Sequence, residues 1–176
     1  MGLKLRLLRL YARAMRGLRP ADRIWLYTGS PDSADNAFRQ FRHDLEQKDG
    51  MARYYICENP DKLEASTDER RRVVAFGSWK HKLLYLRCGK ILTSFCRFSA
   101  IHPFGRETAR ALPTRFEVIC LRHEQTEEPR QREGFPCDRM VISTELERLD
   151  LVTNYGFGVK ELIEAADHKA LRDALV

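Results

Sequence analysis

The sequence predicts an α/β fold with a Rossmann-like parallel sheet flanked by helices. Short apolar runs rich in β-branched residues alternate with segments of helical periodicity, which is typical of parallel sheets. The segment from Arg71 to Ser99 contains this unit in its simplest form. A strand ends at Phe76, Ser78 can cap the helix that follows, and a second strand begins at Ile91. We expect the rest of the chain to repeat this unit on either side.

The expected strands are short and mostly apolar, and turn signals or polar segments separate them. They cover residues 23–28, 52–57, 73–76, 91–95, 117–121 and 139–143. The segment 97–115 lies between two of them and is expected to be a long irregular loop.

Each expected helix presents one apolar stripe to the sheet. The inward positions are Phe38, Phe41 and Leu45 in the helix after the first strand, Trp79, Leu83 and Leu86 in the central helix, and Leu146, Leu149 and Val152 in the helix that follows the capping box of Thr144 and Glu147. A last helix is expected from Asp167 to Leu175.

Composition limits the classes of protein to consider. With 176 residues and 43% hydrophobic content, the chain can form one domain with a substantial core. The five cysteines form no CxxC pair and are odd in number, so we expect reduced core thiols and no metal site. The common nucleotide, metalloprotease and hydrolase motifs are absent, and no cofactor is expected.

Residues 1–22 are expected to form a basic amphipathic helix, distinct from a domain over residues 23–176. Seven of the 31 Lys and Arg residues precede Trp25, but only one of the 25 Asp and Glu residues does. The rest of the chain therefore has 24 basic and 24 acidic residues and no net charge. This distribution does not favour nucleic-acid binding, in which a basic face usually spreads over the domain. Apolar residues from Leu3 to Leu18 share one side of the helix, and the other side carries Arg6, Arg9, Arg13 and Arg16.

Such a pattern is typical of a helix lying in an anionic membrane interface, with its arginines on the headgroups. It predicts a peripheral protein on the cytoplasmic face of the membrane. Two alternatives remain: the helix packs on its own domain, or it binds RNA or another partner.

Polar residues at the carboxyl ends of the strands are the candidates for chemistry, since ligands of open α/β sheets bind there. The loops concerned begin at Gly29, Gly77, Phe95 and Arg122. His123 follows a buried strand and is a candidate general base, with a loop histidine bonded to backbone as the alternative.

The other candidates belong to the central segment. Ser78, at a helix N-terminus, can hold a phosphate or simply cap the helix. Lys80 and His81 are expected on the solvated side of that helix, and Ser94 and Arg97 can bind an anionic group.

A Gly-Ser-x-Lys-His segment at Gly77 to His81 is the most specific motif of the chain. Other segments accompany it in a fixed order: Trp25-Leu26, Asp35 to Phe41, Ala52 to Ile56, Leu92 to Ser94, and Val118 to His123. This ordered set resembles the N-terminal half of the CDP-glycerol glycerophosphotransferase family, the teichoic acid polymerases and primases of bacterial cell walls.

The resemblance implies one lobe of a GT-B glycosyltransferase-type fold, the lobe that faces the acceptor and the membrane. The family transfers glycerol phosphate from CDP-glycerol to a hydroxyl of a lipid-linked acceptor. Its proposed base is the histidine of a Gln-His-Gly motif, which carries over to His123, flanked here by Arg122 and Glu124. Ser78, Lys80, His81, Ser94 and Arg97 are then expected near the substrate.

In that family a C-terminal lobe binds the donor, and we expect a separate lobe to supply this function here. Two alternatives stay open at this point. One is a non-catalytic module that docks on a membrane surface or a partner. The other is half of a different GT-B glycosyltransferase.

Overall fold

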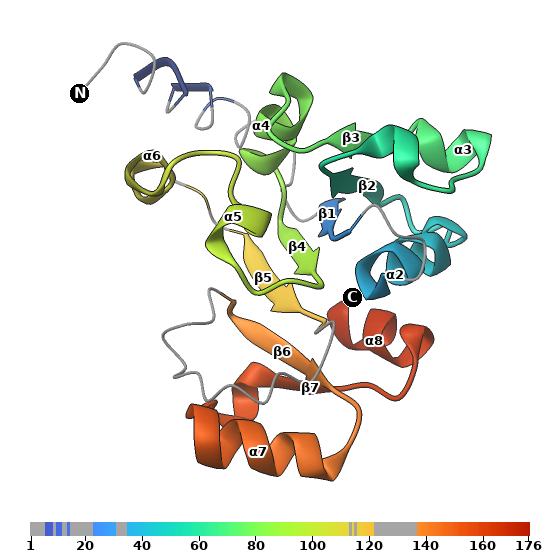
Figure 1. The fold of residues 1–176 in the computed structure, drawn as a ribbon, viewed down its shortest axis with the longest axis vertical. Helices are drawn as coiled ribbons and strands as arrows, with labels where there is room; N and C mark the ends of the chain where they lie inside the picture. The colour runs from blue at the N-terminus through green and yellow to red at the C-terminus, as the bar shows by residue number, and fades with distance from the viewer. Residues whose placement is uncertain are drawn as a thin grey trace.

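The computed structural model describes residues 6–8, 10, 11, 14, 23–30, 35–112, 114, 116–121 and 137–176. Their centre is a seven-stranded sheet with the order β3-β2-β1-β4-β5-β6-β7, in which every neighbouring pair is parallel (Figure 1). The strands are β1 (Ile24–Thr28), β2 (Ala52–Cys57), β3 (Val73–Ala75), β4 (Lys90–Thr93), β5 (Glu117–Cys120), β6 (Arg139–Ile142) and β7 (Leu162–Glu164). The predicted α/β class with a Rossmann-like parallel sheet is confirmed.

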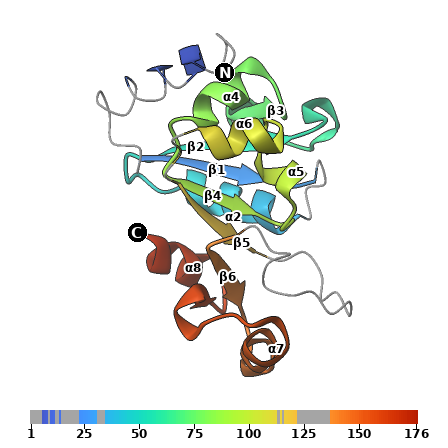
Figure 2. The ribbon, with the colours of Figure 1, turned by 90° about the vertical axis from the view of Figure 1, so that its left-hand side faces the viewer.

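Helices cover both faces of the sheet. They are α2 (Asn36–Leu45), α3 (Thr67–Arg70), α4 (Trp79–Tyr85), α5 (Phe98–Ile101), α6 (Arg106–Ala111), α7 (Glu145–Tyr155) and α8 (His168–Leu175), with 3-10 turns at Pro60–Lys62 and Val159–Glu161. One core cluster joins α4, α5 and α7 to one face of the sheet, and a second joins α2 and α8 to the other. Figure 2 shows α4 and α6 on the opposite side of the sheet from α2.

Side chains that alternate along β1 divide between the two cores. Leu26 points into the α4 side, whereas Trp25 and Tyr27 point into the α2 side, and all three are fully buried. A strand buried on both faces reads as a continuous apolar run, which is why the sequence identifies the central strands so clearly.

Two expectations about connections need correction. Residues 97–115 do not form one irregular loop, because α5 and α6 lie within this segment. The strand β7 was not expected, since its three residues follow a short 3-10 turn and give too little pattern to recognise.

The expected inward faces of two helices also need correction. In α4, Leu86 is buried as expected, but Trp79 is exposed and the other buried positions are His81, Leu84 and Tyr85. In α7 the residues Leu151 and Tyr155 are buried. The expected stripe of α7, made of Leu146, Leu149 and Val152, lies on the exposed side. Both helices are short, so a shift of one residue in the stripe fits the sequence almost equally well.

The caps that the sequence predicts are present. Ser78 accepts a hydrogen bond from the backbone N–H of His81, and Asp167 accepts one from that of Ala170. Thr144 and Glu147 form a reciprocal capping box at the start of α7, which ends at Gly156 in the left-handed conformation. These bonds satisfy N–H groups that lack partners within the first turn of a helix.

The described part of the N-terminal segment is helical at residues 6–8, 10, 11 and 14. Leu8 is 7% exposed and packs, with Tyr11 beside it, against the core on the α4 side. Leu7 and Leu10 are 58% and 63% exposed. One side of the segment therefore contacts the domain while another presents leucines to solvent. Among the described residues, no helix is long and apolar enough to cross a bilayer.

The cysteines differ from the expected set of reduced thiols. Cys96 and Cys120 form a disulfide with their Cα atoms 6.1 Å apart, and Cys57, Cys88 and Cys137 are free and buried. The disulfide joins the segment after β4 to the end of β5. These cysteines are 24 residues apart and come together through the pairing of β4 with β5, which spacing alone does not indicate.

A buried carboxylate ties together the central elements at the carboxyl edge. Asp35 caps α2 by accepting hydrogen bonds from the backbone N–H groups of Ala37 and Phe38. The Ser94 hydroxyl, after β4, donates to Asp35 Oδ1 over 2.9 Å and accepts from the Ala37 N–H over 2.9 Å. The Tyr55 hydroxyl of β2 donates to the Ser30 carbonyl over 2.6 Å.

Gly29 has no space for a side chain beside this network. A Cβ atom at Gly29 would lie 2.2 Å from Asp35 Oδ1 and 2.7 Å from the Tyr55 hydroxyl. The constraint is steric, because Gly29 is not among the described glycines with positive φ.

Gly29→Ala is expected to lower the free energy of unfolding by roughly 1–3 kcal/mol, the usual cost of forcing atoms into a packed site. Gly105→Ala is the matched control, since nothing lies within 4 Å of its added Cβ; its effect should stay below about 1 kcal/mol. Urea unfolding followed by circular dichroism measures both. Equal effects of the two substitutions would contradict the assigned crowding.

Candidate functional site

The strand order reverses between β1 and β4. From β1 the chain passes through α2 to β2 on one side, whereas β4 lies on the other side of β1. At such a switch point the loops after the two strands diverge and leave a crevice at the carboxyl edge, which is where open α/β sheets bind ligands. The fold therefore points to the ends of β1 and β4 as the first place to examine.

A cleft of about 310 Å³ occupies this position, and we name it the switch-point cleft. Its walls come from the loops after β1, β2, β3 and β4 and from the start of α5. They are lined by Thr28, Gly29, Ser30, Ile56, Cys57, Glu58, Phe76, Phe95, Arg97, Ser99 and Ala100. Two of the loops named from the sequence, those starting at Gly29 and Phe95, meet here, and Phe76 stands directly before the third.

Thr28 is the most informative residue of the cleft. It is 2% exposed, and its Oγ1 atom has no hydrogen-bond partner among the described residues. A buried hydroxyl without a partner costs free energy, so such groups are uncommon unless a ligand or water satisfies them. The Thr28 hydroxyl is therefore a candidate ligand contact at the floor of the cleft.

Arg97 supplies positive charge at the rim. Its side chain is exposed, and it forms no ion pair with any residue in the described part of the chain. A free guanidinium beside hydroxyl groups, here Thr28 and Ser99, suits a phosphate or carboxylate, because it donates several hydrogen bonds from one planar group. Glu58 on the opposite wall gives the cleft mixed charge.

The helix α5, which contributes Ser99 and Ala100 to the cleft, is fixed to α4. The Tyr85 hydroxyl of α4 lies 2.5 Å from His102 Nδ1, just after α5. The His102 ring also stacks on Phe98, with 4.1 Å between ring centroids. These contacts hold α5, which carries Ser99, against α4.

Of the residues predicted to bind substrate, Arg97 lines the switch-point cleft. Ser94 lies behind it, in the Asp35 network. Ser78 and Lys80 are not among the described lining residues: Ser78 caps α4, and the Lys80 ammonium lies 5.4 Å from the Tyr54 ring centroid. Their predicted roles are not tested by this geometry.

His81 is not on the solvated side of its helix, which corrects the expectation from its lysine neighbours. It is fully buried, packs between Phe76 and Tyr85, and accepts a hydrogen bond at Nδ1 from the Gly77 N–H over 3.0 Å. Its Nε2 atom has no partner among the described residues. His81 therefore serves as a core side chain that fixes the turn before α4.

His123 lies outside the described residues, and so do Arg9, Arg13 and Arg16. Arg6 is described and exposed on the N-terminal helix. The predicted base and the predicted membrane contacts thus remain predictions from the sequence.

The important residues missed by sequence reasoning are Thr28, Gly29, Asp35 as a network centre, and Tyr55. The signal for the first two was available, since Thr28 ends the first strand and Gly29 opens the loop at the switch point. Nothing in the sequence indicates that Tyr55 reaches this edge, because that contact depends on how β1 and β2 align.

Burial lowers the pKa of His81 to about 4, with Lys82 as a second cause. The unfolded chain protonates this ring near pH 6.5. Between these values the unfolded state binds a proton that the folded state does not, so stability falls as pH falls. The His81 contribution is complete above pH 6.5 and is lost as pH approaches 4.

His81→Asn keeps an acceptor for the Gly77 N–H and removes the titration. Over this pH interval the wild type is expected to lose about 3 kcal/mol more stability than the variant. Urea midpoints measured from pH 7 to pH 4 test this difference, because all other titrating groups are common to both proteins. Parallel pH profiles would show that His81 titrates normally in the folded state.

No protein-family model matches the chain. It is 28% identical over 102 residues to the minor teichoic acid biosynthesis protein GgaB of Bacillus subtilis (strain 168); the match covers 57% of this chain and 11% of that protein.

Among solved structures, the chain is similar to the wall teichoic acid polymerase TagF, with a TM-score of 0.58 and 9% identity over 92% of this chain. A variant of TagF gives a TM-score of 0.58 and 8% identity over 93% of this chain. The chain spans 44% to 47% of the length of these TagF chains. At this identity the likeness shows the fold.

The two comparisons agree with the ordered motifs. GgaB matches in sequence, and TagF matches in fold over almost the whole chain. The resemblance of this chain to the teichoic acid polymerases of the CDP-glycerol glycerophosphotransferase family is confirmed.

Proposed function

We propose that this chain is the acceptor-side lobe of a glycerophosphotransferase-like enzyme of teichoic acid or related cell-surface polymer synthesis. The switch-point cleft carries the proposal. It places the Thr28 hydroxyl and the Arg97 guanidinium, neither of which has a partner within the described residues, where α/β sheets bind ligands. The sequence match to a teichoic acid biosynthesis protein supports the same process.

In this proposal the switch-point cleft binds the glycerol phosphate end of a lipid-linked acceptor. Arg97 pairs with a phosphate of the acceptor, and Thr28 donates a hydrogen bond to one of its oxygens. His123 accepts the proton of the acceptor hydroxyl as that oxygen attacks the β-phosphorus of CDP-glycerol. A new P–O bond forms to glycerol phosphate, the phosphoanhydride bond breaks, and CMP leaves. A separate donor-binding lobe holds the CDP moiety.

Thr28→Val tests the cleft without removing structure. The substitution deletes a hydroxyl that has no described partner, so the free energy of unfolding should stay equal or rise by about 1 kcal/mol. Binding of a synthetic glycerol phosphate trimer should weaken by roughly five- to tenfold, the value of one net hydrogen bond. Isothermal titration calorimetry and urea unfolding measure the two effects separately.

Arg97→Gln should weaken trimer binding at least as much, whereas Arg110→Gln on α6 is a matched exposed control. Transfer of radiolabel from CDP-glycerol to a lipid-linked acceptor, with the donor-binding lobe added, should be lost in His123→Ala. Unchanged trimer binding in both cleft variants would refute the acceptor site. Full transfer by His123→Ala would remove its role as base.

We also propose that the N-terminal helix rests on an anionic membrane. The exposed Leu7 and Leu10 are three positions apart and so share a side, and Arg6 is exposed near them. Leu8 and Tyr11 hold the helix on the domain. With Arg9, Arg13 and Arg16, this arrangement suits headgroup contact at the cytoplasmic face, where a lipid-linked acceptor would be reached.

The double variant Leu7→Ser/Leu10→Ser should bind anionic vesicles at least about tenfold more weakly, because two exposed leucines no longer enter the interface. Its stability should match the wild type. Leu8→Ser is the reverse control, since it should reduce stability instead. Cosedimentation with phosphatidylglycerol vesicles at two salt concentrations measures binding. Salt-insensitive binding that survives the double substitution would exclude this surface.

A further inference from the structure

A second cavity opens at the carboxyl edge, on the other face of the sheet from the switch-point cleft. It has a volume of about 240 Å³ and lies between the starts of α2 and α8, next to the ends of β5, β6 and β7. We name it the α2–α8 cavity. It shares no lining residue with the switch-point cleft. Its polar lining consists of Asn36, Gln40, Ser143, Asp167 and His168.

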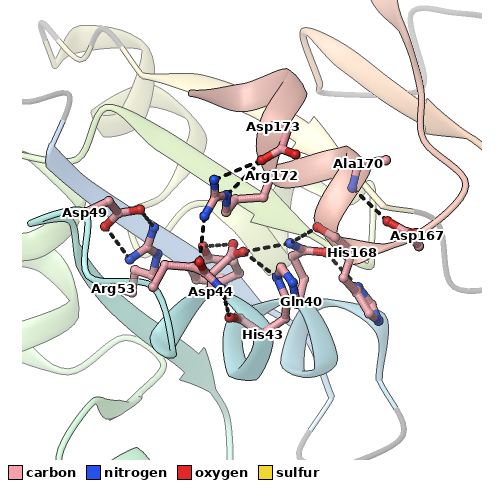
Figure 3. A network of polar contacts seen from close by, with 12 residues as sticks. Gln40, His43, Asp44, Asp49, Arg53, Asp167, His168, Ala170, Arg172 and Asp173 are labelled. Carbon is pink, nitrogen blue, oxygen red and sulfur yellow. Dashed lines mark hydrogen bonds and ion pairs between the residues drawn. The ribbon is translucent and has the colours of Figure 1, made fainter.

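The orientation of the His168 ring follows from the contacts of Gln40, which Figure 3 shows. The Gln40 amide nitrogen donates to Asp44 Oδ1 over 2.9 Å and to the His168 carbonyl over 3.0 Å. Both partners are acceptors, so the amide oxygen must face the other way. It lies 2.7 Å from His168 Nδ1, which therefore carries the proton in this contact.

The residues behind Gln40 prevent it from turning. Gln40 and Asp44 are both fully buried. Asp44 also accepts a hydrogen bond from the Tyr27 hydroxyl over 2.6 Å, and His43 Nδ1 lies 3.1 Å from its other oxygen. The hydrogen-bonding groups of this buried network are all used, so the network fixes the Nδ1 atom of His168. The rest of the His168 side chain is exposed.

The second ring nitrogen, Nε2, carries the lone pair of the neutral ring and has no hydrogen-bond partner among the residues that the structure describes. Partial burial lowers the pKa of His168, and the neighbouring His43 and then Arg39 act in the same direction, against Asp44 and Asp167. The ring is therefore neutral at pH 7, and Nε2 is a hydrogen-bond acceptor there.

The lining selects a kind of ligand. The described walls of the α2–α8 cavity contain a carboxylate, a neutral imidazole, two amides and a hydroxyl, and no lysine or arginine. Such walls accept hydrogen bonds and do not favour a phosphate, in contrast to the switch-point cleft with Arg97. The volume is below the roughly 300–1,000 Å³ of pockets for drug-sized ligands, so a nucleotide is too large.

We infer that the α2–α8 cavity binds a small uncharged polyol, such as a triol unit, whose hydroxyl groups donate hydrogen bonds to His168 Nε2 and Asp167. His168 acts as a binding residue, and Gln40 with Asp44 positions it. This inference does not depend on the proposed transfer reaction, because it concerns a different cavity and a neutral ligand.

The test uses the ¹⁵N-labelled chain titrated with glycerol, with 1-propanol as a probe of equal carbon number and fewer hydroxyls. Long-range ¹H–¹⁵N spectra report the ring nitrogens, and amide spectra report the cavity walls. Glycerol is expected to produce saturable shifts at His168 Nε2 and at the amides of Ser143 and Asp167. 1-Propanol is expected to leave them unchanged.

His168→Asn separates binding from structure. An asparagine can still donate to the Gln40 oxygen but offers nothing at the place of Nε2, so the affinity for glycerol should fall at least about tenfold while the unfolding midpoint is retained. His43→Asn is the control histidine, because His43 does not line the cavity; binding should persist. The inference is overturned if His168→Asn binds glycerol like the wild type, if the spectra show the proton on Nε2, or if glycerol shifts only Thr28 and Arg97. A negative result here leaves trimer binding at the switch-point cleft unaffected.

Discussion

The buried carboxylate of Asp35 is the interaction on which the carboxyl edge of this sheet depends. It contacts the loop after β1 through the Ser30 N–H, starts α2, and joins the segment after β4 through Ser94. Losing one partner would leave a buried polar group unsatisfied, which costs about 1–3 kcal/mol. Since Thr28 and Gly29 lie directly before Ser30, the network also determines where the floor of the switch-point cleft lies.

The two cavities lie at the same edge of the sheet but on opposite faces, and they offer different polar groups to a ligand. Thr28 points to the α4 side, where Arg97 supplies a positive charge. Leu121 and Val141 lie on the α2 side, where His168 and Asp167 supply acceptors. An extended molecule that alternates phosphates with polyol units carries both kinds of group, and the sheet places the two kinds of wall at one edge.

Much of the fold could be predicted from the sequence, because strands buried on both faces leave continuous apolar runs and the caps at Ser78, Thr144 and Asp167 are local signals. The helix faces were harder. His81 lies between two lysines and looks solvated, yet its ring is buried, since the Gly77 N–H needs an acceptor inside the turn.

The sequence predicted where the site lies, but not which contacts form it. The topological rule led to the loops at Gly29 and Phe95, which do line the switch-point cleft. The contacts that give it character come from residues far apart in the sequence: Ser94 reaches Asp35 across 59 positions, and Gln40 reaches His168 across 128. No local pattern encodes such pairs.

The sheet ends in two very short strands, β3 and β7, each of three residues. A long outer strand would expose a row of unpaired amides and carbonyls on which another molecule could extend the ladder. Here β3 and β7 are too short for a strand of another molecule to pair with them. Self-association through backbone pairing is thereby discouraged, and contacts between molecules are left to side chains on the helices.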